Sequence, residues 1–492
     1  MTSNKQITID LAKIPANIIN VTSALTKAGY EAYIVGGCVR DLIIGRTPKD
    51  WDVTTNATPE QIIPLFEKTF YENTFGTVGV VIDDETTVEV TPYRIESSYS
   101  DNRHPDKVIF SDKIEDDLKR RDFTINALAA DPKTGIIVDE FDGLTDIQSK
   151  TIRAVGSPDN RFQEDALRLI RAVRFSAELG FTIDFETQNS MIRNADLIKN
   201  ISVERIRDEL TKIIMSDNPM MGFVFLEKLG LLKHFLPEIS GAVGVKQNQA
   251  HSYDVFEHLL RSLQCSADKK YPFFVRLSAL MHDVGKPTTQ RYVKDRKDYT
   301  FHGHEVVGSR MTEVILKRLK FKNEIIKLVC KMVRWHMFFS DTEQISLSAV
   351  RRIVRNIGAD HIWDLVNLRI CDRVGTGRPK EDPYRLRKYM SMIEEVLREP
   401  VSVSKLKING NDLMKLANLA PGPKVGFILN ILLEDIIEKP ENNTDDYLKD
   451  KTIALNALDL KELKKMSDTA LSAKENAESV ELLEIRNKHK VR

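Results

Sequence analysis

The sequence predicts an α+β protein of several domains, with one sheet-containing unit followed by helical units. The chain has 492 residues, more than one hydrophobic core of roughly 100–200 residues accommodates. Apolar runs with β-branched residues are concentrated before residue 140, and helical periodicity dominates from about residue 155. The hydrophobic fraction of 42% and the charged fraction of 29% are typical of a globular, soluble protein.

Composition and the cysteine pattern exclude several classes of protein. The 72 basic and 72 acidic side chains cancel, so net charge gives no indication of a nucleic-acid partner, although a neutral chain can still contain a basic groove. No apolar stretch is long enough for a membrane span or has the form of a signal peptide. Four scattered cysteines without a CxxC pair argue against disulfides or a thiolate zinc site and predict a cytoplasmic protein.

The individual elements follow from apolar periodicity and turn residues. Within residues 1–30, helical spacing is found at Ile14, Ile18, Val21 and Leu25. We expect strands at Ala32–Val35, Trp51–Val53, Val78–Ile82 and Thr87–Thr91, the last two as a hairpin, and a short helix at Val39–Ile44. Later helices are expected at Arg161–Leu179, Val203–Met215, Pro219–Leu229 and through residues 251–400, which hold seven of the ten histidines. The polar tail Ser467–Arg492 is expected to be frayed.

Asp50 and Asp52, in the run KDWDV, are the first candidates for chemistry. Residues two apart on a strand point to the same face, where two carboxylates repel each other unless a cation lies between them. Such a pair suits two-metal phosphoryl transfer with Mg²⁺, in which one ion activates the attacking hydroxyl and the other neutralises the triphosphate. Glu89, on a later strand, can supply a third carboxylate. The alternative is a strand edge with solvated acids, since a short motif alone is weak.

The residues before this pair favour a phosphate site. Gly36-Gly37 closes a strand and opens a helix, where backbone N–H groups can cradle phosphate oxygens. Arg40 lies one helical turn later and can bind a phosphate through two hydrogen bonds, and Asp41 can orient that arginine. A double-glycine turn alone is usually only a turn, so its position upstream of the carboxylates is what predicts a nucleotide site.

The run that contains these residues, GGCVRDLIIGRTPKDWDV, resembles the signature of class II tRNA nucleotidyltransferases and bacterial poly(A) polymerases, within the polymerase-β-like superfamily. Four later segments resemble the further motifs of that family in the same order: RRDFTINAL (Arg120–Leu128), DEFDGLTDIQSKTIR (Asp139–Arg153), EDALRLIR (Glu164–Arg171) and SVERIRDEL (Ser202–Leu210). Five spaced matches make chance agreement remote. The resemblance implies a polymerase-β-like nucleotidyltransferase head with a mixed sheet, followed by an all-α neck, an HD body and a tail.

The second motif is implied to bind the nucleotide. Asp122 and Asn126 are implied contacts of the ribose and triphosphate. Arg121 can bind the triphosphate, although one arginine of the pair Arg120-Arg121 is expected to be a solvated cation. The full set of nucleotide-binding candidates is Gly36, Gly37, Arg40, Asp41, Arg121, Asp122, Asn126, Asp165, Arg168, Arg171 and Arg174.

The fourth motif suggests how a base is chosen without a template. Asp165 and Arg168 are three apart on an expected helix and share a face. Their acceptors and donors can match the base edges of cytosine and adenine but not those of guanine and uracil, and Glu164 can orient the arginine. The alternative is a surface salt bridge. Ser98–Phe110 resembles the flexible loop of enzymes that add the terminal A, which argues against a CC-only enzyme. The extra basic and aromatic run that follows the head in the poly(A) polymerase branch has no obvious counterpart here, which favours CCA addition.

A second site is indicated by MHDVGK (Met281–Lys286), which resembles the His–Asp doublet of HD-domain phosphohydrolases. In family order, the implied ligands of one or two further divalent ions are His258, His282, Asp283, His304, His336 and Asp372, with His251 and His302 as rivals. Asp283 is implied to bridge the metals, and Lys286 can contact a phosphate. The resemblance implies hydrolysis of phosphomonoesters or 2′,3′-cyclic phosphates, although HD domains also survive as scaffolds.

We therefore expect an enzyme that adds CCA to the 3′ end of tRNA from CTP and ATP, with Asp50, Asp52 and Glu89 as catalytic residues. The expected domains are a head at 1–155, a neck at 156–245, an HD domain at 246–400 and a tail at 401–492 that contacts tRNA. Either the tail lysines or neck residues such as Arg205 can bind the RNA. Alternatives are an A-adding enzyme or poly(A) polymerase, a hydrolase with a relic head, and a noncatalytic RNA-binding protein. The sequence does not predict an oligomeric state.

Overall fold

The chain forms two compact units in a computed structural model, which describes residues 8–72, 75–83, 86–97, 107–249, 252–337, 346–377, 383–398 and 406–490. The first unit comprises Met1–His336 with Asn367–Pro379, and the second comprises Met337–Val366 with Lys380–Arg492. The predicted α+β class is confirmed, because one seven-stranded sheet is accompanied by many helices. Within the described ranges, no helix is long and apolar enough to cross a membrane.

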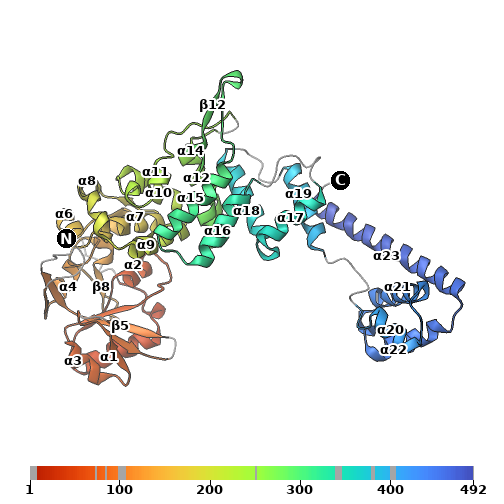
Figure 1. Ribbon diagram of the computed structural model, residues 1–492. Helices are drawn as coiled ribbons and strands as arrows, with labels where there is room; N and C mark the ends of the chain where they lie inside the picture. Colours follow the sequence, from red (N-terminus) through yellow and green to blue (C-terminus); the bar gives the residue numbers. More distant parts are fainter. Residues whose placement is uncertain are drawn as a thin grey trace. The chain divides into compact units, whose positions relative to one another are not determined.

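The large sheet, the head sheet, has the strand order β3-β4-β5-β2-β1-β8-β9, and Figure 1 labels β5 and β8 in it. β2 and β5 are parallel, and all other neighbours are antiparallel, so the sheet is mixed as predicted. Its inner strands are largely buried, which suits their apolar and β-branched residues. The strands are β1 (Ala32–Val35), β2 (Asp52–Thr55), β3 (Thr69–Tyr71), β4 (Val78–Val81), β5 (Thr87–Pro92), β8 (Leu128–Ala130) and β9 (Ile137–Asp139).

Short helices and a small hairpin surround this sheet. The predicted first helix forms as α1 (Ala16–Lys27) and buries Ile18, Val21 and Leu25, whose spacing places them on one face. The other elements are α2 (Gly37–Ile43), α3 (Pro59–Ile62), α4 (Ile114–Lys119), α5 (Gly143–Gln148), β6 (Arg94–Ser97) and β7 (Lys107–Phe110). Most of the predicted loop Ser98–Phe110, at residues 98–106, lies outside the described residues.

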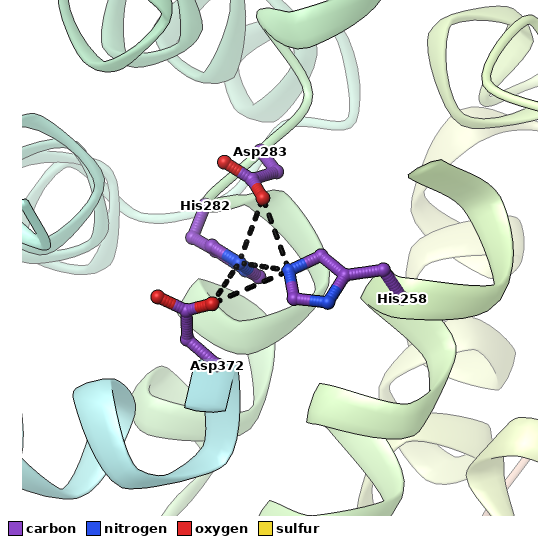
Figure 2. Close-up of side chains that lie close together, drawn as sticks. All are labelled: His258, His282, Asp283 and Asp372. Atoms are coloured by element: carbon purple, nitrogen blue, oxygen red, sulfur yellow. Dashed lines mark hydrogen bonds and ion pairs between the residues drawn. The ribbon is translucent and has the colours of Figure 1, made fainter. Parts of the chain in front are cut away.

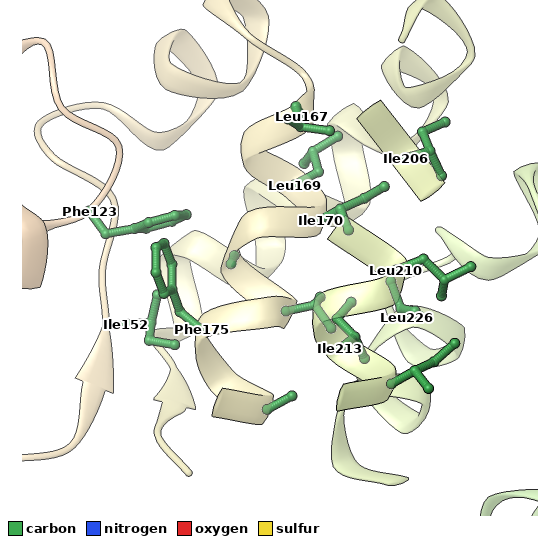
Figure 3. Close-up of a cluster of buried hydrophobic side chains, with 14 of the residues drawn as sticks. Phe123, Ile152, Leu167, Leu169, Ile170, Phe175, Ile206, Leu210, Ile213 and Leu226 are labelled. Carbon is green, nitrogen blue, oxygen red and sulfur yellow. The ribbon is translucent and has the colours of Figure 1, made fainter. Parts of the chain in front are cut away.

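The single helix predicted at Arg161–Leu179 is wrong, because the segment forms two helices, α6 (Pro158–Glu164) and α7 (Leu167–Leu179), separated at Asp165 and Ala166. α7 packs against α9 (Val203–Met215) and α10 (Pro219–Lys228). Figure 3 shows this contact, in which Ile170, Ile213 and Leu226 are fully buried. Small neighbours are β10 (Thr151–Ile152), β11 (Thr182–Ile183) and α8 (Phe185–Asn194).

The rest of the first unit is a group of helices with one hairpin. α12, α13, α15 and α16 pack on one another through buried aliphatic side chains that continue the core of the head and neck. The elements are α11 (Pro237–Ser240), α12 (Val255–Asp268), α13 (Phe273–Met281), α14 (Lys286–Thr289), β12 (Arg291–Val293), β13 (Asp298–Thr300), α15 (His304–Arg318) and α16 (Asn323–Trp335). α18 (Ile362–Gly375) contributes its second part to this unit.

The second unit is helical, and its last helix corrects the expectation of a frayed tail. α23 (Leu460–Lys488) continues through Ser467, which is fully buried, and packs against α21 and α19. Near its end, Lys488 and His489 both bind the Glu394 carboxylate at 2.7 Å. Tertiary contacts therefore stabilise a helix that composition alone does not favour. The other helices are α17 (Leu347–Ile357), α19 (Tyr384–Leu397), α20 (Gly410–Ala417), α21 (Pro423–Glu438) and α22 (Asp445–Asn456).

Candidate functional site

Two carboxylates face each other on neighbouring parallel strands of the head sheet. Asp52, the first residue of β2, is paired in register with Glu89 of β5. Burial raises the pKa of both groups, and the negative charge of Asp52 raises that of Glu89 further. Repulsion of this kind is relieved by a divalent cation, so the donor set fits one.

Asp50 lies near this pair of carboxylates, but it is not part of strand β2. The prediction that Asp50 and Asp52 share a strand face is wrong, because β2 begins at Asp52 and Asp50 lies in the exposed segment before it. Asp50 is still close enough to raise the pKa of Asp52. Among the described residues, Asp50, Asp52 and Glu89 do not form a group with donor atoms all within 4.8 Å of one another.

The double-glycine turn lies directly beside these acids. Gly36 has a φ of 85°, which favours glycine, and a Cβ at this position would lie 2.8 Å from Nη1 of Arg121 and 3.8 Å from Oδ2 of Asp52. The positive charge of Arg121 offsets part of the rise that burial causes in the pKa of Asp52. The missing side chain of Gly36 therefore lets a guanidinium and a carboxylate approach the backbone at the start of α2.

A chain of polar contacts joins five of the predicted nucleotide-binding residues. Arg40 donates through Nε and Nη2 to Asp41 Oδ1 at 2.9 and 2.8 Å and through Nη1 to Asn126 Oδ1 at 2.7 Å. Asn126 donates to Asp122 at 3.2 Å, and Arg171 lies 2.6 Å from the other oxygen of Asp122. Burial alone would raise the pKa of Asp122, but the neighbouring arginines lower it to about 2. The chain thus connects α2 to α7.

Three of the candidate arginines surround one aromatic ring. The guanidinium carbons of Arg174, Arg40 and Arg171 lie 4.2, 5.2 and 5.4 Å from the centre of the Phe175 ring. The ring is buried and offers a face that attracts cations. Arg174 also lies 3.1 Å from the buried Glu209 carboxylate of α9. Phe175 thus contacts three candidate arginines, although the sequence analysis did not single it out.

The geometry expected for Asp165 and Arg168 is wrong, although both lie beside the arginine cluster. Asp165 is extended, with φ −140° and ψ 104°, and lies between α6 and α7 rather than on a helix. Its Oδ2 binds Nη2 of Arg205 at 2.8 Å. Arg168 is held by Glu164 at 2.5 Å and donates to the carbonyl of Arg120 at 3.0 Å. The two side chains therefore have separate partners.

Three partners of the candidate residues could have been found from their spacing in the sequence. Arg205 and Glu209 are four apart on α9, so they share a face, and that face contacts Asp165 and Arg174. Arg205 was proposed only as an RNA contact. The third partner is Asp117, which is fully buried and binds Arg120 at 2.6 Å and Arg121 at 3.1 Å. The spacing of Asp117 before the arginine pair indicates this contact.

The second predicted site brings together four buried side chains, from α12, from the turn after α13 and from α18 (Figure 2). Asp283 Oδ2 lies 3.0 Å from Nε2 of His258 and 3.2 Å from Nε2 of His282. Asp372 Oδ1 lies 3.4 and 3.6 Å from the same two nitrogens. A second group shares Asp283, whose Oδ1 lies 3.2 Å from His304 and 3.6 Å from His336.

The hydrogen bonds of the ring nitrogens show which atoms point into this site. The Nδ1 atoms of His282, His304 and His336 each lie 2.7–2.8 Å from the carbonyl three residues earlier. A carbonyl only accepts, so each Nδ1 donates, and in the neutral ring Nε2 carries the lone pair. Nε2 of His258 lies 3.0 Å from Nε2 of His282. A proton or a metal ion is therefore needed between these nitrogens.

Cations lie beside the same carboxylates. Lys286 Nζ is 2.6 Å from Asp283, and Arg369 forms an ion pair with Asp372. Burial alone would lower the pKa of His282, but Asp283 and Asp372 raise it to about 10. Of the rival ligands, His302 is exposed and belongs to neither group among the described residues, and His251 lies outside them.

Family models match three parts of the chain. A model for the poly A polymerase head domain matches residues 32–153, one for a probable RNA and SrmB-binding site of polymerase A matches 180–242, and one for tRNA nucleotidyltransferase domain 2 matches 306–452. The first of these spans the glycine turn and the facing carboxylates.

Similar proteins cover nearly the whole chain. The CCA-adding enzyme of Lactiplantibacillus plantarum is 33% identical over 432 residues, which is 87% of this chain and 94% of the relative. That of Lactobacillus helveticus is 32% identical over 90% of this chain and 99% of the relative. The crystal structure of the Bacillus stearothermophilus CCA-adding enzyme in complex with CTP is 27% identical, with a TM-score of 0.59 over 89% of this chain and 96% of that one.

Proposed function

This chain belongs to the class II CCA-adding enzymes of the poly(A) polymerase family, and on that premise we propose how its residues carry out the reaction. The enzyme adds C and A nucleotides to the 3′ end of tRNA from CTP and ATP and releases pyrophosphate. The relatives named above add CCA, which favours this activity over A-only or poly(A) addition. The working division is a head at 1–155, a neck at 156–245, an HD domain at 246–400 and a tail at 401–492.

The transferase centre is assigned to Asp50, Asp52 and Glu89, with Asp50 and Asp52 as ligands of Mg²⁺. The in-register pair Asp52 and Glu89 is the observation that carries the assignment, because burial and mutual repulsion make it a good cation site. Bound Mg²⁺ would neutralise charge on the triphosphate. The Gly36 turn brings Arg121 beside the same acids, where it is placed to bind phosphate oxygens.

The nucleotide is oriented by the polar chain from Asp41 to Arg171. Arg40 is held at both ends of its guanidinium, by Asp41 and by Asn126, so little conformational freedom is lost when it binds a phosphate. Asp122 remains ionised because its pKa is about 2, and it accepts hydrogen bonds that align Asn126 for the ribose. Positioning and charge neutralisation supply most of the rate enhancement in such transfers.

Base selection is assigned to Asp165 and Arg168. Asp165 offers acceptors and Arg168 offers donors, which together complement cytosine and adenine. Their separate partners support this role, since Arg205 holds Asp165 and Glu164 holds Arg168 without the two binding each other. Both groups can therefore present hydrogen-bonding atoms to a base instead of neutralising each other.

The histidine–aspartate site is proposed to be an HD-type phosphohydrolase centre for two divalent ions. Its first group is His258, His282, Asp283 and Asp372, and its second is Asp283, His304 and His336. Asp283 directs a different oxygen to each group, which suits a shared ligand. Lys286 is placed to bind a phosphate. Hydrolysis of a 2′,3′-cyclic phosphate would break one P–O bond with addition of water and leave a phosphomonoester.

The transferase proposal is tested with tRNA that lacks its 3′ end. Wild-type protein with CTP alone should add two C residues, and with CTP and ATP it should complete CCA, as read by sequencing the 3′ ends. An enzyme that incorporates no C would be an A-adding enzyme. The hydrolase proposal is tested with a cyclic phosphodiester and added nickel, cobalt or manganese, and it fails if His282→Ala/Asp283→Ala retains the activity of the wild type.

A further inference from the structure

A short hairpin rises beside the histidine–aspartate site and has no role in the proposed chemistry. β12 (Arg291–Val293) pairs with β13 (Asp298–Thr300) in an antiparallel register that places Tyr292 opposite Tyr299. The two rings are 5.2 Å apart at 64°, and Tyr292 is 55% exposed. The hairpin projects from the surrounding helices (Figure 1). A large aromatic side chain is thus presented to solvent.

The same hairpin is basic at its tip. Three cations of the turn, Lys294, Arg296 and Lys297, are exposed, and Arg291 at its base is exposed as well. None of these four side chains forms an ion pair with another described residue. The turn also holds the exposed Asp295 but keeps a net positive charge, so its cations are available to an anionic ligand.

The base of the hairpin is fixed to the metal-binding side chains. Phe301, directly after β13, accepts a hydrogen bond from Nδ1 of His304 at 2.8 Å, and its ring lies 5.5 Å from Nζ of Lys286. At the other end of the hairpin, beside the turn and on the strand face opposite the tyrosines, Asp298 accepts a hydrogen bond from the backbone of Gln249 at 3.3 Å. The hairpin is therefore held at the rim of the site and leaves the tyrosine face open.

We propose that this hairpin binds the last unpaired nucleotides of an RNA chain whose terminal phosphate enters the histidine–aspartate site. The inference rests on the proposed hydrolase and names its substrate class as polynucleotide ends rather than free nucleotides. Exposed aromatic rings that stack on bases, flanked by cations that follow the phosphates, are the general means of binding single-stranded nucleic acid. An acidic protein surface would satisfy the cations but would leave the exposed tyrosine without a partner.

The test compares one RNA substrate with one small substrate. Hydrolysis is measured on a tRNA that ends in a 2′,3′-cyclic phosphate and on adenosine 2′,3′-cyclic monophosphate. Tyr292→Leu, which keeps an apolar side chain against Tyr299 but loses the aromatic face, should lower kcat/KM for the tRNA about tenfold and leave the mononucleotide unchanged. Tyr292→Phe should behave as the wild type. Equal losses on both substrates would overturn the proposal.

Charge is tested with a matched pair of double variants. Lys294→Glu/Arg296→Glu should weaken the tRNA reaction and reduce its salt dependence. Lys322→Glu/Lys327→Glu changes two exposed lysines of the α16 region by the same charge and should have a much smaller effect. If both variants lose the tRNA reaction equally, the hairpin has no specific role and the proposal fails.

A third measurement separates the hairpin from the hydrolase. A tRNA with 4-thiouridine as its last nucleotide is photo-crosslinked to the wild type and to Tyr292→Leu, and the attached peptide is identified by mass spectrometry. Attachment within residues 291–300, reduced in the variant, supports the hairpin even if no substrate is hydrolysed, in which case only the hydrolase fails. Attachment elsewhere, unchanged in the variant, overturns the hairpin inference.

Discussion

Binding of a divalent cation at the histidine–aspartate site is expected to release a proton at neutral pH, because of His282. Burial alone would lower the pKa of His282, but Asp283 and Asp372 raise it to about 10. Nδ1 of this ring already donates to the carbonyl of Ala279, so the titrating proton is on Nε2, the nitrogen that faces the other ligands. The cation and this proton therefore compete for one atom.

The free energy needed to displace this proton follows from the difference between pH 7 and the pKa of His282. A pH of 7 is about three units below the pKa of His282. Each unit corresponds to about 1.36 kcal/mol, so displacing the proton at pH 7 costs about 4 kcal/mol. The apparent association constant should rise about tenfold per pH unit between pH 6.5 and 8.5. Calorimetric titration of Mn²⁺ in two buffers of different ionisation enthalpy measures both the affinity and the number of protons released. The Asp52→Ala variant is used so that the head carboxylate Asp52 does not bind Mn²⁺ as well.

The matched control is His302→Ala, because His302 is exposed and belongs to neither ligand group in the described structure. This variant should bind Mn²⁺ with the same pH dependence and release the same number of protons. His282→Ala should lose most of the affinity and the pH dependence together. An association constant that does not change with pH, or a heat that does not depend on the buffer, would refute the assignment of the proton to Nε2 of His282.

Three further predictions concern substitutions in the head and neck. Asp52→Ala is expected to abolish nucleotide addition to truncated tRNA while tRNA affinity, measured by filter binding, stays largely intact; loss of both would indicate misfolding. Arg205→Ala should free the Asp165 carboxylate and lower the kcat/KM preference for CTP over UTP, whereas Arg205→Lys should restore part of it; an unchanged preference would mean that the contact is only structural. Asp122 has a native pKa of about 2, below its ordinary 3.8, so it stabilises the fold fully above pH 3.8 and loses this contribution as pH falls through about 2. Asp122→Asn should therefore lower the free energy of unfolding at pH 7 by about 2 kcal/mol in urea unfolding, and a variant as stable as the wild type contradicts the linkage with Arg171.

Much of the head could be predicted because its elements depend on neighbouring residues. β1 forms at the predicted residues Ala32–Val35, where a short apolar run ends at two glycines. α9 begins and ends as predicted, at Val203 and Met215. In both segments the local propensity, the apolar pattern and the tertiary packing favour the same structure, so the pattern alone was sufficient.

The break at Asp165 could not be predicted in this way. Asp165 Oδ1 accepts a hydrogen bond from the backbone of Leu167 at 3.0 Å, which competes with helix continuation, and its Oδ2 binds Arg205, forty residues later, at 2.8 Å. Neither contact changes the spacing of the apolar residues. Periodicity therefore predicts one continuous helix, and the tertiary partner decides that Asp165 is extended.

The choice of ligand in the histidine–aspartate site likewise depends on the folded backbone and not on the sequence pattern. His302 and His304 are two residues apart, and their order in the chain favours neither as a ligand. Gly303, with a φ of 78°, turns the backbone between them, so His302 is exposed while His304 begins α15 inside the site. The Phe301 carbonyl then takes the Nδ1 proton of His304 and leaves Nε2 directed at Asp283. Residue type could be predicted from the sequence, whereas the tautomer that enables His304 to bind a cation depends on a carbonyl that only the folded backbone brings to it.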